Sequence, residues 1–352
     1  VPEAKANFEK LIQLKPNHPV GHFYKCYTYF FSAITSSLTK NEKSEFKEVV
    51  KLGDYINSRF DPQNEEDKLF KIAMKAVKIF FDFDEGNWAS AIFGAYSAYK
   101  AIKQLVEEYP GFVDAKIGSG IFNMLISLIP KGLRSVLSFF NITGSIETGI
   151  EHLTLVSQKG KYFKNEALAI LAFYRTYYLK QYEKAKSDYI ILIKKFPRNY
   201  HFQVDYIDTF YYEKKFEECI RIMYVFKKNL ADTLKVKKDY YIYLFDFTEA
   251  RIFFEKKDYN KAMVLFESVI KMRQENWRKD YYAVYSLLYK GMIYDITNNR
   301  EKALNVYYLL KSNLDRDYFT AKQYADMFIK EPFKYNDPRI YKTKKAKGRG
   351  LM

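Results

Sequence analysis

Apolar side chains recur along this chain at three- and four-residue intervals, the period of an amphipathic helix. Between residues 162 and 226 one arrangement occurs twice: a helical segment, a short polar turn and a second helical segment. In both copies an aromatic residue stands three positions before a small one, as in Tyr182 to Ala185 and Phe216 to Cys219. Cys219 follows Ala185 by 34 residues, a period typical of repeats built from two helices. The pattern therefore predicts stacked helical hairpins.

A small residue opens the second helix of each predicted hairpin, where the two helices cross closely. The position recurs at Ala262 and Ala303, in steps of 43 and 41 residues, and we place the added length in connections near residues 231–239 and 273–280. Trp88 to Ala91 has the same aromatic-to-small form. The full set of predicted packing positions is Ala4, Ala91, Ala185, Cys219, Ala262 and Ala303.

Residues 1–15 read as the second helix of a hairpin, because Ala4, Phe8 and Pro16 repeat the spacing of residues 185, 189 and 197. A second helix alone would leave its apolar side uncovered, so we expect a further helix N-terminal to Val1. Further helices are predicted over residues 20–38, 42–60, 65–83, 88–109 and 314–329.

The passage from residue 114 to residue 160 departs from the repeat. Glycines at 111, 118, 120 and 132 indicate close backbone approach or an interruption of the helices. Residues 133–140 are apolar, with Lys131 and Arg134 at one end. Two interpretations stay open: a buried plug that joins two helical layers, or a segment that lies in a membrane interface.

We therefore expect an all-α protein, a right-handed α-solenoid of stacked tetratricopeptide-like hairpins. Residues 1–160 would form N-terminal hairpins with the divergent glycine-rich segment at 114–160. Residues 161–331 would form the regular array, and residues 332–352 a basic, disordered tail.

Several short motifs resemble a particular family. They are Gly86-Asn87-Trp88, residues 118–123, Leu128-Ile129-Pro130, residues 149–153 and residues 159–163. Together they are similar to the tetratricopeptide-repeat-39 and inclusion-body-clearance family and its bacterial relatives, over roughly residues 83–197. The resemblance implies an all-helical protein without known catalytic residues. Some eukaryotic members associate with the mitochondrial outer membrane, and bacterial look-alikes are commonly exported. Residues 143–147 depart from the Gly-Gly-Asp-Arg of many relatives.

Composition leaves the partner open. Aromatic residues make up 18% of the chain, and their rings either fill gaps between hairpins or line a binding surface. The formal net charge is +16, and residues 333–352 hold seven Lys and Arg against one Asp. Such a charge favours acidic proteins, anionic membranes or nucleic acid, or simply a solvated tail. No recognised nucleic-acid module accompanies it, so nucleic acid ranks last among the partners.

No motif for catalysis, a cofactor or a metal is apparent. Pro19 separates His18 from His22, so the two should not share a helical face as a zinc pair would. Cys26 and Cys219 indicate neither a disulfide framework nor a metal cluster. We expect no enzyme, no cofactor and no metal. No apolar run reaches the ~18 residues of a membrane span. The compartment stays open, with the bacterial cell envelope favoured over the cytoplasm through the exported relatives.

Repeat geometry suggests where a partner would bind. In tetratricopeptide arrays the first helix of each hairpin lines the concave groove. The groove-facing positions of four hairpins predict the binding residues Tyr174, Tyr177, Asp208, Tyr211, Phe247, Arg251, Phe254, Met292 and Asp295. Such an aromatic lining would suit an extended or helical peptide. The alternative is that these rings pack between repeats.

We thus expect a non-enzymatic scaffold that binds a partner peptide or protein in an aromatic-lined groove. A second interpretation is a membrane-peripheral adaptor that uses the basic tail and residues 133–140. The sequence does not indicate the oligomeric state.

Overall fold

The computed structural model describes residues 2–35, 40–128, 144–233, 238–273, 277–314 and 319–337. Helices and no strands make up the regular structure of these residues, and the helices pack as sequential pairs, which confirms the predicted all-α class. The chain forms two compact units, residues 1–171 (unit 1) and 172–352 (unit 2). Within the described part of the chain, no helix combines the length and apolar character that a bilayer crossing requires.

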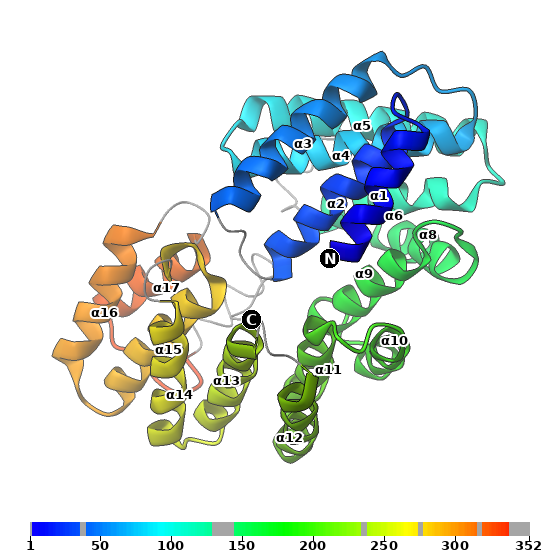
Figure 1. The fold of residues 1–352 in the computed structure, drawn as a ribbon. Helices are drawn as coiled ribbons and strands as arrows, with labels where there is room; N and C mark the ends of the chain where they lie inside the picture. The colour runs from blue at the N-terminus through cyan, green and yellow to red at the C-terminus, as the bar shows by residue number, and fades with distance from the viewer. Residues whose placement is uncertain are drawn as a thin grey trace. The chain divides into compact units, whose positions relative to one another are not determined.

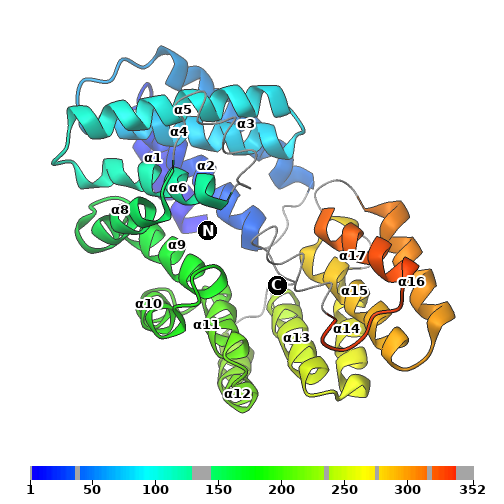
Figure 2. The ribbon, with the colours of Figure 1, turned by 180° about the vertical axis from the view of Figure 1, so that it is seen from behind.

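Unit 1 begins with a layer of long helices. Neighbouring helices pack against one another from α1 to α5, and α3, α4 and α5 lie side by side (Figures 1 and 2). The helices of this unit are α1 (Pro2–Leu14), α2 (Pro19–Thr35), α3 (Lys40–Arg59), α4 (Glu65–Asp84), α5 (Trp88–Glu108), α6 (Lys116–Leu128) and α8 (Ile146–Lys159), with a short 3₁₀ turn, η1 (Val113–Ala115), before α6.

Two glycines allow α6 and α8 to cross with their backbones close together. A Cβ placed on Gly120 would lie 3.3 Å from the carbonyl oxygen of Gly149, and one on Gly149 would lie 3.1 Å from that of Gly120. The latter would also meet Met124 Cγ at 2.5 Å. Close contact thus explains Gly118 and Gly120 of the predicted glycines, whereas a Cβ on Gly111 would meet nothing within 4 Å and Gly132 lies outside the described residues. The predicted plug or membrane segment at residues 133–140 lies outside the described residues.

A buried carboxylate fixes the entry into the next helix, α9 (Lys164–Tyr177). Asp114 accepts hydrogen bonds from the backbone nitrogens of Lys161, Tyr162 and Phe163 at 2.7, 2.9 and 2.9 Å. Amide donors just before a helix lack carbonyl partners within the helix, and a carboxylate can satisfy them. Asp114 thus holds a tight turn between α8 and α9. The predicted domain boundary at residue 160 falls at the end of α8, whereas the two units separate within α9.

Unit 2 continues as successive hairpins. Its remaining helices are α10 (Tyr182–Lys195), α11 (Tyr200–Tyr212), α12 (Phe216–Thr233), α13 (Lys238–Glu255), α14 (Tyr259–Met272), α15 (Tyr281–Ile296), α16 (Arg300–Asn313) and α17 (Phe319–Lys330), with the 3₁₀ turn η2 (Trp277–Lys279) before α15. The first helices of consecutive hairpins also touch, since α11 packs on α13 and α13 on α15. The right-handed winding of the hairpins into a solenoid stays a prediction.

The hairpin turns share one backbone geometry. The residue two positions before the second helix is left-handed, with φ of 55° at Lys180, 61° at Lys214, 61° at Lys257 and 59° at Asn298. Gly86, before α5 in unit 1, takes the same place with φ of 79°. In most of these turns the next backbone nitrogen donates to a carbonyl five residues back, as in a Schellman C-cap.

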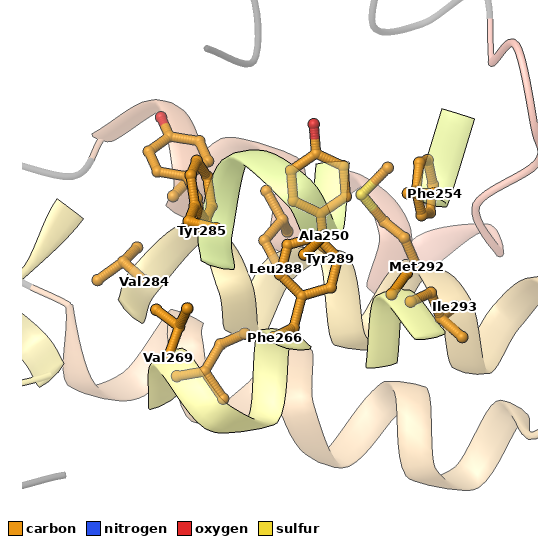
Figure 3. Packing of buried hydrophobic residues seen from close by; sticks show 14 of the residues in the cluster. Ala250, Phe254, Phe266, Val269, Val284, Tyr285, Leu288, Tyr289, Met292 and Ile293 are labelled. Carbon is orange, nitrogen blue, oxygen red and sulfur yellow. The ribbon is translucent and has the colours of Figure 1, made fainter. Parts of the chain in front are cut away.

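Small and aromatic side chains fill the interior of the hairpins. Ala185, Cys219, Ala262 and Ala303 are fully buried, Ala91 is buried, and Ala4 is partly buried. Figure 3 shows the packing between α13, α14 and α15, where the rings of Phe266 and Tyr289 stack 4.9 Å apart. Burial of one such ring stabilises the fold by roughly 1.5–3 kcal/mol.

The chain does not leave unit 2 after α17. Residues 332–337, assigned from the sequence to a disordered tail, instead pack against the array, because Phe333 and Tyr335 bring aromatic rings to Phe254. The rest of the predicted tail, residues 338–352, lies outside the described residues.

Candidate functional site: the first helices of unit 2

An aromatic cluster lies where α9 meets α11. It consists of Phe173, Tyr174, Tyr177, Tyr178 and Tyr212. The ring of Phe173 lies 4.7 Å from that of Tyr177, and Tyr177 meets Tyr212 edge-on at 5.7 Å. Phe173 is 37% exposed, and Tyr177, Tyr178 and Tyr212 are partly buried. The cluster therefore reaches the surface of unit 2.

Beneath the aromatic cluster, one tyrosine hydroxyl meets two carboxylates. The Tyr177 hydroxyl lies 2.7 Å from Oδ1 of Asp205 and 3.0 Å from Oδ2 of Asp208. Burial, together with the negative charge of Asp208, raises the pKa of Asp205 to about 7. The Tyr177 hydroxyl has one hydrogen and can donate to only one of the two carboxylates. When Asp205 is protonated it donates to the Tyr177 oxygen, and the Tyr177 hydroxyl donates to Asp208, so both contacts are hydrogen bonds. The same burial raises the pKa of Tyr177 well above its ordinary value.

Arg251 of α13 carries the network to the next hairpin. Its Nη1 donates to both oxygens of Asp208, at 3.2 and 3.4 Å. The guanidinium also lies over the ring of Tyr211, 4.1 Å from the ring centroid. With only 2% of Arg251 exposed, this ion pair is held away from water. The pair therefore fixes the relative position of α11 and α13.

Glu255 ends the network at the last turn of α13. Its Oε1 accepts a hydrogen bond from the Tyr211 hydroxyl at 3.3 Å, and its Oε2 accepts one from Tyr335 at 3.2 Å. One connected set, which we call the inner-helix network, thus links the first helices of three hairpins to the segment after α17. Its members are Tyr177, Asp205, Asp208, Tyr211, Arg251 and Glu255.

The predicted binding residues fall into two groups. The first group belongs to the inner-helix network or to the aromatic rings that contact it. Its members are Tyr174, Tyr177, Asp208, Tyr211, Phe247, Arg251 and Phe254. Met292 lies in the core of α13, α14 and α15, while Asp295 binds the Tyr307 hydroxyl and Arg300. All of the nine are buried except Tyr177, which is partly buried. Direct contact between them and a partner stays a prediction.

Other residues of the site were absent from the sequence-based set: Phe173, Tyr178, Asp205, Tyr212, Glu255, Phe333 and Tyr335. Asp205 had a signal, since it lies three positions before Asp208 and so shares its helical face. The aromatic pair Phe333 and Tyr335 was hidden by the surrounding lysines, which suggested a solvated tail.

The inner-helix network consists of hydrogen bonds, an ion pair and ring contacts. Among the described residues, no group of three or more His, Cys, Asp or Glu side chains has the arrangement of a metal site. His18 and His22 face different partners, the Asp67 carboxylate and the carbonyl of Pro16. The network contains aromatic rings, carboxylates and one cation, and its members Asp208, Tyr211 and Arg251 are buried and paired with one another.

The hairpins share one turn geometry, and their first helices pack on one another. These features are those of a helical-repeat protein of the tetratricopeptide type. The chain belongs to the Iml2/Tetratricopeptide repeat protein 39 family, whose profile matches residues 23–286. This confirms the family resemblance seen in the sequence and extends it beyond residues 83–197.

Two solved structures are similar to this chain. A monomeric mutant of IFIT1 with Gppp-AAAA has 14% identity and a TM-score of 0.49, and the match covers 88% of this chain and 67% of that one. The human IFIT1 dimer with m7Gppp-AAAA has 14% identity and a TM-score of 0.47, with 92% and 67% covered. Likeness at this level gives no information on ligands. Among curated proteins, none has a sequence that matches this chain significantly.

Proposed function

We propose that this protein is a non-enzymatic scaffold that binds a segment of a partner protein along the first helices of unit 2. The observation that carries the proposal is the aromatic cluster at α9 and α11, which reaches the surface while the inner-helix network holds it from below. Phe173 offers an exposed ring, and the hydrogen bonds of Tyr177 fix the neighbouring ring. A preorganised aromatic surface loses little conformational entropy on binding, which favours affinity.

The test is quantitative recovery of the native partner by the full chain. Phe173→Ala with Tyr178→Ala removes two rings of the aromatic cluster, and we expect at least a tenfold loss of recovered partner. Tyr211 is buried and suits this test poorly, because its loss would also damage the core.

A matched control removes rings from second helices. Tyr224→Ala with Tyr308→Ala deletes side chains of α12 and α16 that are 71% and 51% exposed. This double variant should recover the partner as the wild type does. Equal losses from both pairs would exclude the aromatic cluster as the binding surface.

One observation in unit 1 favours a second candidate, a membrane-peripheral adaptor. Trp88, Ile92 and Phe93 of α5 are exposed on one side of the helix, Phe93 to 74%. Exposed aromatic and aliphatic side chains on one helix face are typical of helices that lie in a membrane interface. The basic residues after residue 333 would add attraction to anionic lipid.

Vesicle co-sedimentation tests this candidate. Ile92→Glu with Phe93→Glu places two charges on the exposed face, where they should leave the fold intact. If α5 binds a membrane, the variant should pellet at least fivefold less with vesicles of phosphatidylserine and phosphatidylcholine than the wild type. Truncation after residue 333 measures the share of the basic residues. No pelleting of the wild type would exclude the candidate.

A further inference from the structure

The segment after α17, residues 331–337, lies on the site described above, and we call it the strap. It runs from the C-terminus of α17 to the ends of α13 and α15, which precede it by several tens of residues. Phe333 is only 4% exposed and Asp337 is buried, whereas Lys334 and Asn336 between them are exposed. Residues 335 and 336 form a turn, with φ of 60° at Asn336, so the buried and exposed side chains alternate along a short irregular segment.

Two anchors hold the strap. The backbone nitrogen of Phe333 donates to Oδ2 of Asp295 at 2.8 Å, at the end of α15. The Phe333 ring lies 6.2 Å from that of Phe254 and 5.2 Å from that of Phe328. One main-chain hydrogen bond and one buried ring thus define the first anchor.

Tyr335 is the second anchor, at the end of α13. Its hydroxyl lies 3.1 Å from the carbonyl oxygen of Glu255 and 3.2 Å from the Glu255 carboxylate. Its ring lies 6.3 Å from that of Phe254, and Lys257 Nζ lies 4.9 Å from the ring centroid. The aromatic contacts of both anchors converge on Phe254.

The residues that receive the strap lie on first helices of unit 2, outside the aromatic cluster of α9 and α11. Phe254 and Asp295 are among the predicted binding positions, and Glu255 belongs to the inner-helix network through Tyr211. The array therefore already accommodates a short irregular segment with two aromatic side chains separated by one residue. A segment outside regular secondary structure can open at a lower free energy than the helices beneath it.

We propose that the strap is an internal competitor: the ends of α13 and α15 bind a short aromatic-x-tyrosine segment of a partner protein, which displaces Phe333 and Tyr335. The inference rests on the proposed function and names the partner segment. The partner's first aromatic ring packs on Phe254, its main chain donates to Asp295, and its tyrosine hydroxyl donates to Glu255. Affinity for the partner is set by the difference between its contacts and those of the strap.

The test uses the full chain and a fluorescent peptide with the sequence of residues 329–338. Phe333→Ala with Tyr335→Ala empties the site, so the variant should bind the peptide at least tenfold more tightly than the wild type. A control peptide with alanine at both aromatic positions should bind neither protein. Tyr335→Phe, which keeps the ring and loses the hydroxyl, should give an intermediate gain. A folded double variant that binds the peptide no better than the wild type would overturn the proposal.

Hydrogen exchange on the wild-type chain keeps the proposal testable if the double variant does not fold. The Phe333 amide, bound to Asp295, should exchange at least tenfold faster than the most protected amides of α13 and α15. Exchange at the same rate as those amides would show that the strap leaves only when unit 2 unfolds, and this would also overturn the proposal.

The outcomes separate the two proposals. If the peptide fails to bind while Phe173→Ala with Tyr178→Ala still abolishes partner recovery, the strap is structural packing and the proposed function stands. If the peptide binds but the aromatic-cluster variant recovers the partner fully, then the partner does not use α9 and α11, and the proposed function fails.

Discussion

Unit 1 and unit 2 are both built from paired helices, but α6 and α8 of unit 1 come together by other means than the hairpins of unit 2. In unit 2, small residues and left-handed turns recur from hairpin to hairpin, and a buried ion pair links consecutive first helices. In unit 1, α6 and α8 instead cross at Gly120 and Gly149, and Asp114 holds the turn that follows α8. In a regular repeat, equivalent residues of successive hairpins lie in a row and can form an extended binding surface. In an irregular unit, each helix contact depends on its own set of residues.

Of the variants that test this comparison, removal of the buried ion pair should change the free energy of unfolding most. Arg251→Ala leaves the carboxylate of Asp208 buried without its cation, which should destabilise unit 2 by about 3–5 kcal/mol. Chemical denaturation followed by circular dichroism measures the loss. In unit 1, Lys103→Ala breaks an exposed pair with Glu107 and should cost no more than ~0.5 kcal/mol. Similar losses from both variants would contradict the account of the network.

The carboxylate pair should make the stability of unit 2 depend on pH. Asp205 has a pKa of about 7 in the folded protein, above its unfolded value of roughly 3.9. The folded state therefore keeps a proton that the unfolded state releases. This contribution to stability is fully present below about pH 4 and is lost as pH rises through about 7. Asp205→Asn, which resembles the protonated acid, should flatten the pH dependence of the unfolding free energy in this window. An unchanged slope would contradict the raised pKa.

The glycine crossing gives the corresponding test in unit 1. Gly149→Ala forces a Cβ to within 2.5 Å of Met124 Cγ and 3.1 Å of a backbone oxygen. We expect a loss of roughly 1–3 kcal/mol, because α6 and α8 must move apart. Gly111→Ala is the matched control, since a Cβ there meets nothing within 4 Å, and its thermal midpoint should stay that of the wild type.

The smallest expected effect concerns the turns, where the two units use different residues for one conformation. Gly86→Ala puts a Cβ at φ of 79° and should cost about 1 kcal/mol. Lys214→Gly relieves the same strain in unit 2 and should raise the thermal midpoint slightly, with the entropy of glycine offsetting part of the gain. The two losses in free energy of unfolding are then compared. A larger loss from Lys214→Gly than from Gly86→Ala would contradict the shared turn geometry.

The sequence predicted the hairpins well because their determinants are local. The aromatic-to-small spacing at Tyr182 to Ala185 marks the beginning of α10 within a few residues, and the same is true at Phe216. The candidate site was less accessible, because a repeat position indicates which side of a helix a residue occupies and not what covers it. Arg251 illustrates this: its position was predicted, whereas its burial against Asp208 and Tyr211 depends on the neighbouring hairpin.

The strap could not be predicted for a related reason. Phe333 and Tyr335 lie among charged residues, and their contacts with Phe254 and Glu255 join positions some eighty residues apart in the chain. Only the alternation of two aromatic residues around Lys334 distinguishes this stretch from a solvated basic tail. Long-range packing of a short segment leaves no periodic pattern in the sequence.

The most direct measurement compares the two units in one experiment. The photo-crosslinking residue p-benzoylphenylalanine is placed at Phe173 of unit 2 or at Phe93 of unit 1 in the full chain, and the native cells are irradiated. The account predicts a discrete protein adduct from position 173 that disappears when Tyr178→Ala is added, and no such adduct from position 93. Equal protein adducts from both positions, or an adduct from position 93 alone, would contradict the assignment of partner binding to the first helices of unit 2.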